Sequence, residues 1–142
     1  MTYTTQTDLE DAFGATELVQ IADRDGDGLP DAGLLAAVSK RAYSFINGYL
    51  AGRYALPLDA PYPPVIIAAS CDLERYWLYD DDATERVREG FEDVVAWLKD
   101  VDAGKVLLQL PGASSNIAMG SPDGSAPDRM FDLSGETVLS QF

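Results

Sequence analysis

The chain has 142 residues and a net charge of −14, with 46% hydrophobic and 24% charged residues. This length is typical of one domain, and the apolar share is large enough to bury a core. The excess of acidic residues repels phosphate groups, which argues against nucleic-acid binding and against docking on anionic membranes. We therefore expect one globular domain that recognises neither DNA nor a membrane surface.

Two residue types that often carry chemistry are absent or rare. The chain has no histidine and one cysteine, Cys71. Without histidine there is no His-dependent catalytic triad, and a single cysteine cannot form an intramolecular disulfide. No secretory leader precedes the first polar residues, and no apolar stretch approaches the roughly 20 residues of a membrane span. These features favour a reducing cytoplasm.

The N-terminal part predicts two short helices. Thr7 and Glu10 have the spacing of a capping box, so the first helix is expected to start there and to stop at Gly14. Residues 15–22 predict a second short helix, whose apolar residues share one face. Together these segments predict a helical hairpin.

A long amphipathic helix is expected after Asp31, which is its expected N-cap. Apolar residues recur at spacings of three and four from Leu34 to Tyr49. The helix should end before Pro57, because proline disfavours helical geometry in the residue that precedes it. The proline-rich residues 57–64 then predict a stiff connection between helices.

Two further helices complete the expected domain. Pro64 suits the first turn of a helix that runs to about Tyr79 and is broken by Asp80–Asp82. Thr84, or the last residue of that acidic turn, is expected to cap a final helix that stops at Gly104. The predicted fold class is an all-α small helical bundle of about four to five helices.

Residues 110–142 differ in composition from the rest of the chain. They are rich in Gly, Ser, Pro and Ala with isolated apolar residues, so they cannot build a core of their own. We expect a helical domain over residues 1–109 and an extended C-terminal assembly arm over 110–142 that orders against a partner. The alternative is a terminus without a role. Lone cations and isolated aromatics are typical anchors, and the candidate partner contacts are Arg129, Phe131 and Phe142.

Residues 23–31, DRDGDGLPD, have the pattern of the first half of a calcium loop. Oxygens at loop positions 1, 3, 5 and 9 and a glycine at position 6 can converge on a hard cation. Position 12 is Leu34 instead of glutamate, so a complete site needs another ligand. The alternative is a tight turn without an ion, in which Asp31 caps the next helix. The candidate calcium ligands are Asp23, Asp25, Asp27, Leu29 and Asp31.

The other reactive residues favour a non-enzymatic protein. Glu92 and Asp93 have the chemistry of a glycosidase acid and base, but nothing in the sequence indicates a cleft around them. Cys71 has no basic neighbour and is expected to be a buried apolar residue. The role of Arg53-Tyr54 stays open between a partner contact and the end of a helix.

Several segments follow one order along the chain. The most specific is residues 46–58, INGYLAGRYALPL, which follows Asp8-Leu9 and Phe13-Gly14 and precedes Cys71-Asp72 and Ala96-Trp97-Leu98. In this order the sequence resembles the Mu-like phage head-tail connector family over nearly its whole length. The closing segment departs from that family, which tends to have a basic end containing Phe.

This resemblance implies a helical virion protein of the neck, assembled in the cytoplasm of the bacterial host. The implied assembly is a ring of about twelve subunits beneath the portal, with a heterologous interface between neighbouring copies. The implied partners are the portal protein, other copies of the chain and a stopper or tail-completion protein, while DNA passes through the channel without specific binding. It also implies no catalysis and no required cofactor. The residues alone leave two alternatives, a calcium-binding helical interaction module and a non-virion assembly factor.

Overall fold

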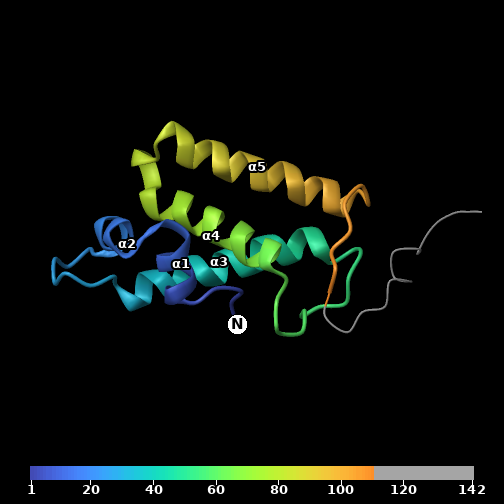
Figure 1. Cartoon of the computed structure of the whole chain (residues 1–142), viewed down its shortest axis with the longest axis horizontal. Coiled ribbons are helices and arrows are strands. Elements are labelled where there is room, and N and C mark those ends of the chain that lie inside the picture. The colour runs from blue at the N-terminus through green and yellow to red at the C-terminus, as the bar shows by residue number, and fades with distance from the viewer. Residues whose placement is uncertain (111–142) are drawn as a thin grey trace, which may run out of the picture. The chain divides into compact units, whose positions relative to one another are not determined.

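The computed structural model describes residues 1–110. These residues form five α-helices joined by short loops and no strand, so the predicted all-α class is confirmed (Figure 1). No helix in residues 1–110 is long and apolar enough to cross a membrane. The helices are α1 (Gln6–Phe13), α2 (Ala15–Ala22), α3 (Ala32–Leu50), α4 (Pro64–Tyr79) and α5 (Glu85–Asp102), with a 3-10 turn, η1 (Asp80–Asp82), between α4 and α5.

The long helices α3, α4 and α5 run in alternating directions, each returning beside the one before it (Figure 1). Helix α4 contacts each of the other four helices, and the hairpin of α1 and α2 lies against it. Met1–Leu108 forms one unit, which we call the helical unit. The sequence-based boundary at residue 109 and the arm over residues 110–142 stay predictions, because almost all of that arm lies outside the described residues.

The start of α1 differs from the prediction. Its capping box is formed by Thr5 and Asp8, two residues before the predicted pair Thr7 and Glu10. The Thr5 hydroxyl accepts a hydrogen bond from the Asp8 N–H (3.2 Å), and the Asp8 carboxylate accepts one from the Thr5 N–H (2.8 Å). The predicted end of α1 is confirmed, since Gly14 follows the helix with a φ of 94°.

The other helix ends follow the sequence closely. Pro64 begins α4, and the Thr84 side chain caps α5. Asp31 precedes α3 at the N-cap position, but its side chain makes no capping bond and instead accepts a hydrogen bond from the Arg24 N–H (3.0 Å). The predicted N-cap position of Asp31 is therefore confirmed, while its carboxylate binds the preceding loop instead of the helix.

One part of the core joins the hairpin to α3 and α4. Apolar side chains from these four helices pack together with almost no exposed surface. Cys71 is among them, and burial raises the pKa of its thiol to about 12, which makes it a structural residue rather than a nucleophile. The buried members are Leu9, Leu18, Ala22, Leu35, Val38, Cys71 and Leu78.

A buried carboxylate lies within this packing. The Glu74 side chain on α4 has 0% exposed surface and accepts hydrogen bonds from the hydroxyls of Thr4 (2.6 Å), Ser39 (2.6 Å) and Ser70 (2.7 Å). O–H···O bonds this short are among the stronger hydrogen bonds in proteins. The N-terminal segment, α3 and α4 therefore meet at one side chain.

We expect Glu74→Leu to destabilise the protein by about 3 kcal/mol, because three buried hydroxyls lose their acceptor at once. Glu74→Gln keeps one carbonyl acceptor and should cost about 1 kcal/mol. Urea denaturation of the two variants beside Glu89→Gln, which changes an exposed glutamate on α5, measures these differences. Wild-type stability of Glu74→Leu would contradict the role given to this carboxylate.

Candidate functional site

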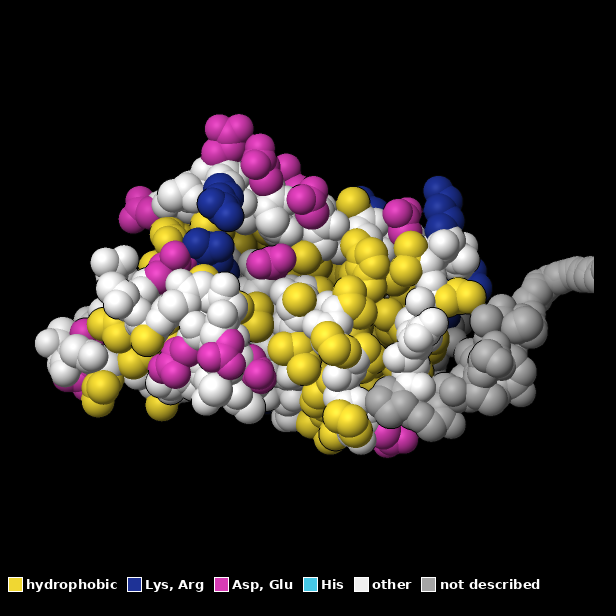
Figure 2. Space-filling model, viewed as in Figure 1, with side chains coloured by type: hydrophobic (Ala, Val, Ile, Leu, Met, Phe, Trp, Pro, Cys, Tyr) yellow, Lys and Arg dark blue, Asp and Glu magenta, His cyan; other side chains and the backbone are white. Residues whose placement is uncertain are grey.

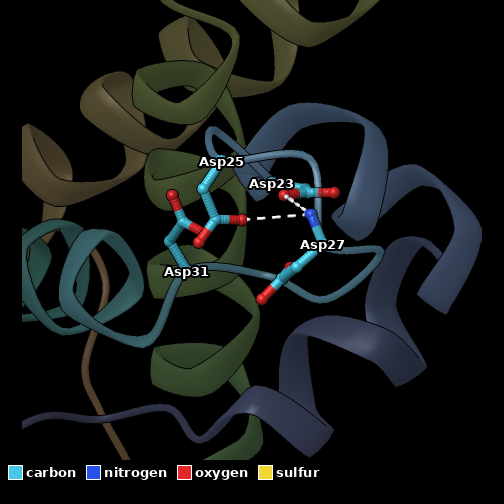
Figure 3. Close-up of side chains that lie close together, drawn as sticks. All are labelled: Asp23, Asp25, Asp27 and Asp31. Carbon is cyan, nitrogen blue, oxygen red and sulfur yellow. Dashed lines mark hydrogen bonds between the residues drawn. The ribbon is translucent and has the colours of Figure 1, made fainter.

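The predicted calcium loop folds as one closed turn between α2 and α3, shown in Figure 3. We call residues 23–31 the acidic loop. Its ends are joined by a hydrogen bond from the Asp31 N–H to the Ala22 carbonyl (2.8 Å). Gly26 and Gly28 have φ values of 79° and 84°, a region that glycine enters without the steric cost of a side chain. These glycines reverse the chain so that its carboxylates face one another.

The loop brings four carboxylates into a small volume. One oxygen from each lies within 4.8 Å of the others. The first and the last of the four are half-buried, and the two between them are exposed. Oxygen ligands in such number suit a hard divalent cation such as calcium. The four residues are the predicted ligands Asp23, Asp25, Asp27 and Asp31.

Backbone N–H groups also bind these carboxylates. Asp23 accepts hydrogen bonds from the N–H groups of Gly26 (2.8 Å) and Gly28 (2.8 Å). The Asp27 N–H lies between two acceptors, Asp25 at 3.1 Å and Asp23 at 3.3 Å (Figure 3). Such bonds also shape tight turns that hold no ion. The hydrogen bonds therefore fix the loop geometry. They are compatible with a calcium site and with a tight turn that holds no ion.

The pKa values of the first two carboxylates in the loop shift in opposite directions. The pKa of Asp23 is lowered, chiefly because its carboxylate accepts the Gly28 N–H bond. The pKa of Asp25 is raised: the hydrogen bond from the Asp27 N–H lowers it, but the bond shared with Asp23, desolvation and the charges of Asp27 and Asp31 together outweigh that effect. Because the folded pKa of Asp23 is depressed, its stabilising effect is present above about pH 4 and is lost as the pH falls.

The remaining positions of the calcium pattern fit less completely. Leu29 has a side chain that is 65% exposed, and its backbone carbonyl is the atom expected to serve at loop position 7. Leu34, at position 12, packs its side chain against the core and offers no carboxylate. The four carboxylates are therefore the groups that could hold a cation, and the other coordination positions would need the Leu29 carbonyl, water or another ligand.

Arg24 anchors this loop to the helical core, a role that the sequence analysis did not foresee. Its guanidinium donates to the carbonyls of Ile21 (3.2 Å) and Leu78 (3.0 Å), which joins the end of α2 to the end of α4. The signal was hidden because Leu78 lies 54 positions away in the sequence. Arg24 also lines a groove beside the loop, together with Gln20, Ile21, Leu78, Tyr79, Asp80, Asp81 and Asp82.

Two further sets of residues were predicted as candidate sites. Arg129, Phe131 and Phe142 lie outside the described residues, so their role as partner contacts stays a prediction. Glu92 and Asp93 are consecutive exposed residues on α5.

Comparison with known proteins identifies relatives of the chain. The family model described as Bacteriophage Mu, Gp36 matches residues 3–123. "Gene product J" of Escherichia phage Mu is 33% identical over 125 residues, which cover 87% of this chain and 85% of the relative. "Mu-like prophage FluMu protein gp36" of Haemophilus influenzae is 38% identical over 65 residues, 46% of this chain and 45% of that protein. The match to the family model spans well over half of the chain, and the protein therefore belongs to the bacteriophage Mu Gp36 family.

Proposed function

We propose that this phage protein is a head-tail connector subunit, an adaptor that forms a ring beneath the portal and joins the DNA-filled head to the tail. The observation that carries the proposal is the membership of the Mu Gp36 family over residues 3–123, together with the connector pattern in residues 46–58. Its partners in this proposal are the portal protein, neighbouring copies in a ring of about twelve and a stopper or tail-completion protein. The virion neck is the corresponding location.

The charge of the described surface supports this role. In Figure 2, Asp and Glu side chains lie along the first part of α5 and around the end formed by α1 and α2, with a few Lys and Arg side chains among them, while hydrophobic side chains gather across the middle of this face. An acidic wall repels the phosphates of DNA, so a duplex can slide past it without being held. Such a surface suits a conduit better than a protein that grips DNA.

A structural role also agrees with the residues available for chemistry. The chain has no histidine, Cys71 is buried with a raised pKa, and the paired carboxylates on α5 are exposed to solvent. In this proposal the protein acts by binding, without catalysis and without a required cofactor. A non-virion assembly factor is the competing role, and the composition of the virion separates the two.

Quantitative mass spectrometry of purified, DNA-filled virions gives the first test. We expect about one copy of this protein per portal subunit, because a closed ring that docks on the portal carries a fixed stoichiometry. Absence from the virion would refute the connector role and favour the assembly factor.

The predicted arm supplies a second test. Truncation after Gln109 should leave the helical unit folded, because the cut keeps the buried Leu108 and falls after the exposed Gln109. The truncated protein should no longer attach tails to heads. Thermal unfolding followed by circular dichroism checks the fold, and complementation of a phage that lacks the gene checks attachment. Infectious particles assembled with the truncated protein would contradict the arm hypothesis.

Single substitutions refine this result within the full chain. We expect Arg129→Ala, Phe131→Ala and Phe142→Ala to lower the yield of tailed particles, because truncated anchor residues typically cost about 1–2 kcal/mol or more of binding. Ser125→Ala, in the same segment, serves as the matched control and should assemble normally.

We also propose that the acidic loop binds calcium and that the ion braces the connector subunit. The supporting observation is the convergence of four carboxylate oxygens within 4.8 Å. This proposal is compatible with the connector role, and it is also the basis of the alternative in which the protein is a calcium-responsive binding module.

Calcium titration tests the loop. At a free calcium concentration of 100 times the Kd, the ion should stabilise the folded protein by about 2.7 kcal/mol and raise its melting temperature. Asp25→Ala should weaken binding, whereas Asp59→Ala, an exposed aspartate outside the loop, should bind as the wild type does. Calorimetry that detects no calcium binding, together with unchanged melting of Asp25→Ala, would reduce the loop to a turn.

A further inference from the structure

The chain is held by a second segment where it leaves α5. Arg53 donates a hydrogen bond from Nε to the backbone carbonyl of Asp102 (2.7 Å), the last residue of the helix. The Tyr54 hydroxyl accepts a hydrogen bond from the Leu108 N–H (2.9 Å). Both side chains come from the connection between α3 and α4, and their role was left open by the sequence. The structure assigns both of them to the exit from α5.

Gly104 shows how closely this contact is packed. It has a φ of 81°, and a Cβ placed on it would lie 2.9 Å from Cζ and from Nη2 of Arg53. Carbon atoms do not approach that closely, so any side chain at this position would displace the guanidinium. The Arg53 guanidinium therefore packs directly against the backbone that follows α5.

The segment is also held from the side of α5. The N–H groups of Gly104 and Lys105 donate to the carbonyls of Val101 (3.1 Å) and Asp100 (2.9 Å). Farther along, Leu108 is buried at 8% exposure, whereas Leu107 is 49% exposed. Residues 102–108 are thus fixed at both of their ends before residues 109–142 begin.

We propose that Arg53 and Tyr54 are positioning residues for the C-terminal segment, residues 109–142. They fix the point at which this segment leaves the helical unit, and they share force on the segment between the last turn of α5 and the connection between α3 and α4. The inference rests on the proposed function, in which the C-terminal segment attaches the subunit to its partners.

The size of two effects separates positioning from simple tethering. If residues 109–142 served only as a tether, release of residues 103–108 would lengthen that tether by about one sixth. Because effective concentration falls roughly as the −3/2 power of tether length, this change would weaken attachment by only about 1.3-fold. Positioning predicts a larger loss, since a free exit lets the segment point in many directions and lets force unravel the end of α5.

Amide hydrogen exchange of the isolated full-length protein tests the contact itself. Tyr54→Phe removes only the acceptor oxygen, so protection of the Leu108 amide should fall about tenfold. The melting temperature should stay close to that of the wild type. Tyr49→Phe is the matched control, because it removes the same group from a ring that packs against Phe45. Unchanged protection at Leu108 in Tyr54→Phe would refute the contact.

Paired substitutions test the packing of Arg53. Gly104→Ala should lower the melting temperature, and it should lower it less in the Arg53→Ala background, because the displaced guanidinium is then absent. The part of the effect that remains reports the positive φ of Gly104. Equal losses in the two backgrounds would show that Arg53 does not pack on Gly104.

Assembly of particles tests the positioning role. Tyr54→Phe and Arg53→Ala should each lower the yield of tailed particles by at least about threefold relative to Tyr49→Phe, which exceeds the effect of tether length. Arg53→Lys, which keeps a donor for the Asp102 carbonyl, should restore part of the yield. A loss within about 1.3-fold would overturn the positioning role.

Truncation after Gln109 separates this inference from the proposed function. If the truncated protein still attaches tails, the C-terminal segment is dispensable and the proposed role of the arm fails, whatever the Arg53 and Tyr54 variants do. If truncation abolishes attachment while Tyr54→Phe and Arg53→Ala attach normally, only the positioning inference fails.

Discussion

The arrangement of the helical unit depends on one buried carboxylate. Burying Glu74 without partners would cost several kcal/mol, so its place inside the protein requires the three hydroxyls that surround it. Two of those hydroxyls belong to other segments, Thr4 before α1 and Ser39 in α3. These two hydrogen bonds fix the axial position of α3 relative to α4 and hold the N-terminal segment on the same core. The position of Tyr3, next to Thr4, depends on the same contact, and its ring packs against Tyr43 and Tyr62.

The hairpin of α1 and α2 is placed on this core by polar contacts as well. Arg75 on α4 donates two hydrogen bonds to Glu17 on α2, at 2.5 and 2.9 Å, and its guanidinium lies 5.3 Å from the centre of the Phe13 ring. With the first turn of α2 held by Arg75 and with Arg24, just after α2, bound to the Leu78 carbonyl, the acidic loop starts from a fixed position. The four carboxylates therefore stand on a loop whose ends are anchored. A cation that bound there would cost less conformational entropy of the loop.

Local patterns predicted most of the fold, and long-range contacts decided the rest. The 3.6-residue period, proline at the start of α4 and glycine after α1 are signals within a few residues, and the helix boundaries followed them. The acidic loop was predictable for the same reason, because all its carboxylates lie within nine residues. The start of α1 was placed wrongly because both Thr5 and Thr7 begin a capping pattern, and burial of the preceding residues selects Thr5.

Contacts between distant residues left no comparable signal. Glu74 stands in a helix where a glutamate is ordinarily solvent-exposed, and its partners Thr4 and Ser39 are 70 and 35 positions away. The same holds for Arg53, whose bond to Asp102 spans 49 positions. Such residues are recognised only after the helices have been packed, because neither periodicity nor propensity carries information about a partner on another helix.

The packing of the Arg53 guanidinium on Gly104 has an evolutionary consequence. A mutation that gives position 104 a side chain removes the space that the guanidinium occupies, and a small residue at position 53 restores that space. Neither change is neutral alone, yet each lessens the harm of the other. Among descendants of this chain, substitutions at the two positions are therefore expected to occur together and in a constrained order. The two positions are nevertheless separated in the sequence by about half the length of the helical unit.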